Sequence, residues 1–125
     1  MRLLLDTHVY LWWLQDGRRL SRVARAKIAD ASKVFISSAS IWEVSIKAGV
    51  GKLDVDVDAL VASISENGFI ELPVTATHAA KVRDLPQIHR DPFDRLLVAQ
   101  AICEPLTFLT LDEVLKNYSG LVELV

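Results

Sequence analysis

The chain has 125 residues, of which 51% are hydrophobic and 24% are charged. This composition favours a single globular domain over residues 1–125, and the formal net charge of −2 indicates no general basic surface for nucleic acid, although an acidic metal site can mask a local one. The one cysteine, Cys103, excludes an internal disulfide, and no apolar run approaches the roughly 18 residues of a membrane span, so we expect a cytoplasmic protein with no membrane contact.

The first half of the chain alternates short apolar runs with segments of helical period. In chain order, it predicts a strand over residues 3–5, a helix over 7–15 that stops at Asp16-Gly17, a helix with Ser21 as its N-cap, a strand over 34–36 and a helix over 38–49.

The second half continues this alternation. It predicts a helix around residues 60–64 that ends at Asn67-Gly68, a strand over 69–72, a weaker helix over 76–85, a helix over 92–104, a strand over 107–109, a short helix after Leu111 and a strand over 121–125. The first, second and fourth strands are continuously apolar, which indicates that both of their faces are covered. The sequence therefore predicts an α/β fold with a parallel sheet of four or five strands flanked by helices.

Four acidic residues stand near the predicted carboxyl ends of strands, where open α/β sheets place their binding sites. Asp6 directly follows the first strand, Glu43 lies in the helix after the second, and Asp112 follows the fourth. Asp94 joins them if its helix begins at the same edge of the sheet. Crowded carboxylates repel one another, so a cluster of this kind is typical of a site for Mg²⁺ or Mn²⁺, which prefer oxygen ligands.

Each of the four acids also has a competing structural interpretation. Ser40 and Glu43 fit a capping box, and Glu43 can also pair with Lys47 one turn further on. Asp6 is harder to explain in this way, because an acid that ends a buried strand lacks an obvious structural task.

The other two positions also have capping interpretations. Thr110 and Glu113 fit a capping box that makes Asp112 an ordinary first-turn acid. In the segment Asp91-Pro92-Phe93-Asp94, we interpret Asp91 as the N-cap residue, followed by proline at the first helical position and an acid at the third. A role for Asp91 in holding Arg95 or a metal-bound water is the alternative. Thr7 and Thr110 are candidates to hydrogen-bond the carboxylates of the site.

Cationic and aromatic residues indicate where contacts could form, and more than one interpretation stays open for them. The densest basic run comprises Arg18, Arg19, Arg22, Arg25 and Lys27. Such a run is typical of a solvated helix face, and contact with phosphate or with an acidic partner is the alternative interpretation. Closer in sequence to the acids are Lys47, Lys52, Arg90 and Arg95. The first helix carries Tyr10, Trp12 and Trp13, of which one or two should be core and another partly exposed at an interface.

The three histidines lack the spacing of metal ligands. His8, His78 and His89 are scattered along the chain, so we do not expect a zinc site. His8 follows Asp6 closely enough to touch the acidic site, although a buried or capping histidine is the simpler interpretation.

Four segments, in this order, resemble the PIN domain family, and within it the VapC-type toxins of toxin–antitoxin pairs. They are LLLDTHVYLWWL, ISSASIWEVSIKAGVGKL, HRDPFDRLLVAQA and FLTLD, which together span nearly the whole chain. The resemblance implies a Rossmann-like nuclease fold in which acids bind Mg²⁺ or Mn²⁺ and cleave RNA by means of a metal-activated water. Carried over residue by residue, the metal-binding and catalytic acids fall on Asp6, Glu43, Asp94 and Asp112.

The resemblance also implies partners, namely an RNA substrate, a homodimer and a cognate antitoxin whose helix lies in a groove. Two other functions stay open at this point. One is a PIN-fold module that binds a partner without catalysis. The other is a receiver-like signalling domain, which would need a phosphoacceptor aspartate after the third strand, where the segment FIELPV has none.

Overall fold

Five parallel strands form one sheet in the computed structural model, which describes residues 1–15 and 17–125. The strands are β1 (Arg2–Leu5), β2 (Lys33–Ser37), β3 (Ile70–Leu72), β4 (Thr107–Thr110) and β5 (Val122–Leu124), arranged in the order β3-β2-β1-β4-β5. Receiver domains have the order 2-1-3-4-5, so the topology excludes the receiver-like alternative.

The helices follow the predicted alternation. They are α1 (Thr7–Leu14), α2 (Arg22–Asp30), α3 (Ser38–Gly49), α4 (Val57–Glu66), α5 (Ala76–Lys81) and α6 (Pro92–Cys103), with 3₁₀ helices η1 (Val82–Asp84) and η2 (Glu113–Tyr118). The weak helix expected over 76–85 is divided into α5 and η1, and the short helix after Leu111 is the 3₁₀ helix η2. Asp16, where the first helix was expected to stop, lies outside the described residues. Among the described residues, no helix is both long and apolar enough to span a membrane.

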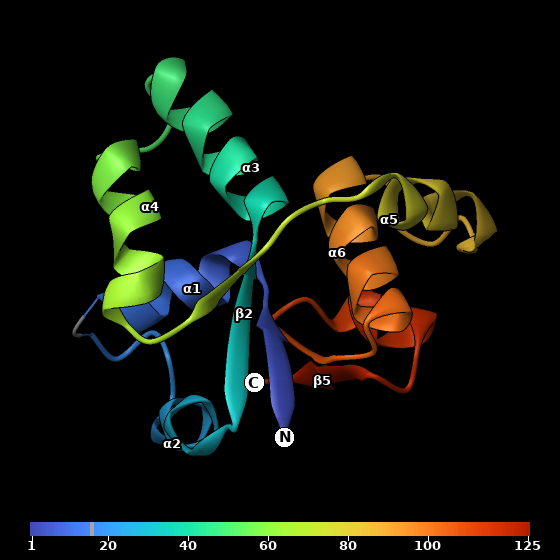
Figure 1. The fold of residues 1–125 in the computed structure, drawn as a ribbon, viewed down its shortest axis with the longest axis horizontal. Coiled ribbons are helices and arrows are strands. Elements are labelled where there is room, and N and C mark those ends of the chain that lie inside the picture. The colour runs from blue at the N-terminus through green and yellow to red at the C-terminus, as the bar shows by residue number, and fades with distance from the viewer. Residues whose placement is uncertain (16) are drawn as a thin grey trace.

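Two hydrophobic cores lie on opposite faces of the sheet. Leu3 and Leu5 of β1 pack in one core with α1, α2 and α4, whereas Leu4 between them packs in the other core with α6. All three side chains are fully buried, which confirms that β1 is covered on both faces. Figure 1 shows α1, α2 and α4 on one side of the sheet and α5 and α6 on the other.

The strand order also determines where a site can form. From β1 the chain moves outward through β2 and β3, and it then returns to build β4 and β5 on the other side of β1. The crevice between the carboxyl ends of β1 and β4 is therefore the switch point at which open α/β sheets bind ligands. Because α6 leads into β4 through a crossover, its N-terminus lies at that same edge of the sheet.

Local contacts account for part of the basic and aromatic sequence. Tyr10 is buried and its hydroxyl hydrogen-bonds Ser63, whereas Trp12 and Trp13 are half-buried, as expected for core and partly exposed aromatic residues. Arg25 donates to the carbonyl oxygens at the end of α1, including that of Gln15 at 2.6 Å. Of the basic run, Arg25 therefore serves to hold α1 and α2 together.

Candidate metal and active site

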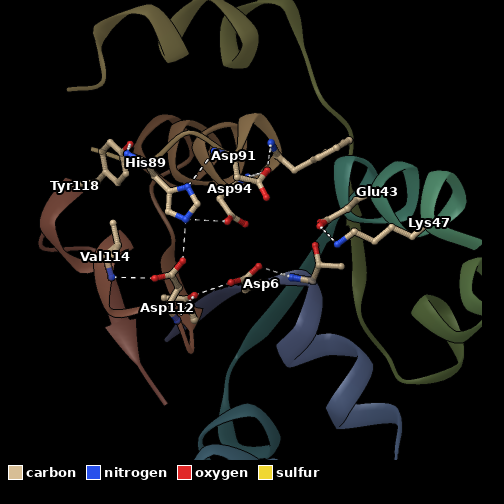
Figure 2. A network of polar contacts seen from close by, with 12 residues as sticks. Asp6, Glu43, Lys47, His89, Asp91, Asp94, Asp112, Val114 and Tyr118 are labelled. Atoms are coloured by element: carbon tan, nitrogen blue, oxygen red, sulfur yellow. Dashed lines mark hydrogen bonds and ion pairs between the residues drawn. The ribbon is translucent and has the colours of Figure 1, made fainter. Parts of the chain in front are cut away.

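The four predicted acids converge on one cleft from four different elements. Asp6 follows β1, Glu43 lies in α3, Asp94 lies in the first turn of α6, and Asp112 follows β4. The cleft has a volume of about 390 Å³ and is also lined by His8, Trp12, Lys47, Asp91 and Leu111. In Figure 2 the carboxylates of Asp6, Glu43 and Asp94 face the same central space.

Asp6 is nearly buried and is held by two hydrogen bonds. Its Oδ1 accepts from the backbone N–H of Thr7 at 2.7 Å, and its Oδ2 accepts from the hydroxyl of Thr110 at 2.6 Å. Burial raises the pKa of Asp6 above its ordinary value even though both hydrogen bonds lower it. Asp6 is also the N-cap residue of α1, which is a structural task that its sequence position did not predict.

Glu43 combines a predicted ion pair with an unpaired oxygen. Its Oε2 accepts from Nζ of Lys47 at 2.9 Å, and this hydrogen bond is the main cause of the raised pKa of Lys47. Its Oε1 is buried and has no partner among the described residues. The capping box at Ser40 is wrong, because Ser37 caps α3 and Ser40 lies within the helix, where its hydroxyl accepts from Thr7 at 2.8 Å.

Asp91 and Asp94 have different roles. Asp91 is confirmed as the N-cap of α6, with its Oδ1 accepting from the N–H groups of Phe93 at 2.8 Å and Asp94 at 3.3 Å. The side chain of Asp94 extends into the cleft, where desolvation and then the charges of Asp6 and Asp91 raise its pKa to about 7. Arg95 directs its guanidinium to the carbonyl oxygens of Val82 and Leu85 instead of to Asp91.

Asp112 caps η2 and contacts a histidine that the sequence did not indicate. Its Oδ1 accepts from the N–H of Val114 at 3.0 Å, so Asp112 is itself the N-cap and the capping box at Thr110 is wrong. Its Oδ2 lies 2.9 Å from Nε2 of His89, and Oδ2 of Asp94 lies 3.5 Å from the same nitrogen. One feature of the sequence could have indicated His89 as a site residue. It lies two residues before the N-cap of α6, which brings it to the same edge of the sheet.

The donor set fits a hard divalent cation. The cleft offers carboxylate oxygens, of which Glu43 Oε1 is buried and unpaired among the described residues. Burial raises the pKa of Asp6, and burial together with the charges of neighbouring carboxylates raises the pKa of Asp94, so the protein alone disfavours their ionised forms. A cation bound between these carboxylates would offset the free-energy cost of ionising them. Oxygen ligands favour Mg²⁺ or Mn²⁺ for this role.

Comparison with known proteins identifies relatives along the whole chain. Residues 3–121 match the sequence profile of the PIN domain. Ribonuclease VapC22 from Mycobacterium tuberculosis is 29% identical over 118 residues, which are 92% of this chain and 90% of that protein.

Solved structures share the fold at low sequence identity. The structure of VapBC2 from Rickettsia felis bound to a promoter DNA fragment superposes with a TM-score of 0.71 at 17% identity, covering 100% of this chain and 98% of that chain. A toxin–antitoxin complex from Klebsiella pneumoniae superposes with a TM-score of 0.66 at 20% identity, covering 97% and 95%. The α/β architecture is therefore that of these structures.

Proposed function

The chain belongs to the PIN domain family, and from this premise we propose that it is a VapC-type ribonuclease toxin that uses Mg²⁺ or Mn²⁺ held by Asp6, Glu43, Asp94 and Asp112. The observation that carries the proposal is the convergence of these four acids on one cleft, with a buried oxygen of Glu43 left without a partner among the described residues. Similarity to Ribonuclease VapC22 along nearly the whole of both chains supports RNA as the substrate.

Several groups of the cleft have a definable task in phosphodiester hydrolysis. A bound divalent cation would supply charge neutralisation and an activated water for attack on phosphorus. Thr7 and Thr110 fix the carboxylate of Asp6 through both of its oxygens, so that it needs little reorganisation. Lys47 lines the cleft and presents an ammonium group, which is suited to a phosphate oxygen of the substrate. No side chain has to form a covalent intermediate.

Cleavage of RNA by the purified protein tests this function. We expect Asp6→Asn and Glu43→Gln to lower the cleavage rate in Mg²⁺ at least about 100-fold, a loss comparable to removing a preorganised electrostatic group. EDTA should abolish cleavage by the wild type. Asp58→Asn is the matched control, because Asp58 is exposed on α4 outside the cleft. Equal rates for the wild type and both cleft variants would contradict the assignment.

A second hollow is the candidate site for an antitoxin helix. It measures about 340 Å³ and lies between the end of α1 and the start of α4, with Leu11, Leu14 and Leu60 among its apolar residues and Asp54 and Asp56 among its polar ones. An apolar groove with acidic residues suits an amphipathic helix that carries basic groups. Leu14→Glu should weaken binding of the antitoxin while leaving the melting temperature unchanged; an unchanged affinity would contradict this placement.

The exposed face of α3 is the candidate homodimer interface. Trp42, Ile46 and Val50 follow one another at helical spacing and are 59%, 45% and 66% exposed. Trp42 packs edge-on against Phe93 of α6, with ring centroids 4.9 Å apart, which extends the apolar surface across two helices. Large apolar side chains clustered on a surface mark protein interfaces, and we propose that a second copy of the chain covers this one.

A further inference from the structure

We propose that His89 is a positioning residue of the acidic site, which donates its Nε2–H to Asp112 beside Asp94 and is not a metal ligand. The inference deepens the proposed ribonuclease function and rests on it. The simplest alternative treats these three residues as a metal-binding set, because one ligand atom of each lies within 4.8 Å of the others.

The protonation pattern of the ring decides between the two roles. Nδ1 of His89 accepts the backbone N–H of Asp91 at 3.0 Å, so this nitrogen carries no proton. The proton of the neutral ring therefore resides on Nε2. A metal ligand needs an unprotonated nitrogen, and moving the proton to Nδ1 would direct an N–H group at the N–H of Asp91. The ring is therefore set to donate from Nε2.

The Nε2–H group points between two carboxylates of the site. It lies 2.9 Å from Oδ2 of Asp112, which is a hydrogen bond, and 3.5 Å from Oδ2 of Asp94, which is a weaker electrostatic contact. Figure 2 shows one nitrogen of the ring facing both acids, with the other nitrogen turned toward the start of α6. One N–H group therefore holds Asp112 by a hydrogen bond and attracts Asp94, which lies in a different element.

The loop that carries His89 is itself held in place. The backbone N–H of His89 donates to the hydroxyl of Tyr118, at the end of η2, at 2.7 Å. The segment of Asp112 and η2 is thus joined to His89 at both the ring and the backbone. Asp112 is tied in turn to the strand ends, because its N–H donates to Oγ1 of Thr110, which donates to Asp6.

These bonds form a continuous chain around the cleft. It runs from Asp6 through Thr110, Asp112 and His89 to the backbone of Asp91, whose side chain caps α6 next to Asp94. His89 is the side chain that joins the strand-end part of this chain to the α6 part. Loss of the His89 side chain should leave each acid in its own helix or strand end. It should, however, disturb the orientation of the carboxylates relative to one another, on which metal affinity depends.

Two substitutions of His89 test the Nε2–H donor and the Nδ1 acceptor of the ring separately. His89→Asn places an amide oxygen near the position of Nδ1 and loses the donor to Asp112, whereas His89→Gln places an amide N–H near the position of Nε2. Binding of Mn²⁺, followed by electron paramagnetic resonance, should weaken about 10-fold in His89→Asn, as is usual for groups that orient metal ligands. His89→Gln should recover most of the affinity. Gln87→Ala, an exposed change in the same loop, is the control.

A spectroscopic measurement completes the test. Long-range ¹H–¹⁵N spectra of the wild-type ring should show the Nε2–H tautomer both without metal and with saturating Mg²⁺. An Nδ1–H tautomer in the Mg²⁺-bound protein would identify His89 as a ligand and overturn the inference, as would wild-type Mn²⁺ affinity in His89→Asn. If the wild type binds no Mn²⁺ at all, the proposed metal-dependent function fails first, and the inference fails with it.

Discussion

Asp94→Asn should stabilise the metal-free protein at neutral pH, although it removes a proposed metal ligand. The rise of the Asp94 pKa from 3.8 to about 7 corresponds to roughly 4 kcal/mol against the ionised carboxylate in the folded state. Because the folded pKa is raised, the stability associated with this group is fully present below about pH 3.8 and is lost as the pH rises to about 7. A neutral asparagine does not suffer this loss.

The gain should therefore depend on pH. In urea denaturation with EDTA present, we expect the unfolding free energy of Asp94→Asn to exceed that of the wild type by about 2 to 4 kcal/mol at pH 8. At pH 5, this difference between the variant and the wild type should be smaller by roughly 2 kcal/mol. Mg²⁺ should stabilise the wild type more than the variant, because the variant lacks one of the four proposed ligands. Asp58→Asn, at an exposed position of α4, should stay within about 0.5 kcal/mol of the wild type. A variant that is no more stable than the wild type at pH 8 would refute the reasoning.

Three further substitutions test other contacts. Thr110→Val should cost about 1 to 3 kcal/mol of unfolding free energy, measured in urea, because it leaves the buried Oδ2 of Asp6 without its donor. Trp13→Ala should cost about 2 to 4 kcal/mol in the same assay, because the indole contacts Phe69 and donates to Asn67. Ile46→Glu should convert a dimer to a monomer in light scattering, and an unchanged mass would place the dimer interface elsewhere.

The parts of the fold that follow from local chemistry were predictable. The continuous apolar runs of β1, β2 and β4 indicated a sheet covered on both faces, and the alternation with helices indicated parallel strands. The rule that sites form at the carboxyl ends of such strands then predicted that Asp6, Glu43 and Asp112 lie close together. Asp94 was expected to join them only if its helix begins at that edge, and α6 does so because it leads into β4.

Helix caps were less predictable, because several polar residues compete for the same position. Ser37, Ser38 and Ser40 are all suitable N-cap residues, and the backbone enters the helix after Ser37, which leaves Ser40 to bond Thr7 instead. Glu43 therefore has no partner at the cap and faces the cleft.

The role of His89 could not be predicted from spacing. Its position depends on the path of the loop before α6, which is held by the hydroxyl of Tyr118, 29 residues further along the chain. Contacts of this kind depend on tertiary packing, which no local pattern records. The same holds for Arg25, whose guanidinium donates to the carbonyl oxygens at the end of α1.

Diffraction from crystals soaked in millimolar Mn²⁺ would show where the metal binds, because the anomalous signal locates it. We predict a peak between the carboxylates of Asp6 and Asp94, within coordination distance of Glu43, and no peak in crystals of Asp94→Asn. A wild-type map without a peak in this cleft, or with a peak bound through the ring nitrogen of His89 alone, would contradict the account.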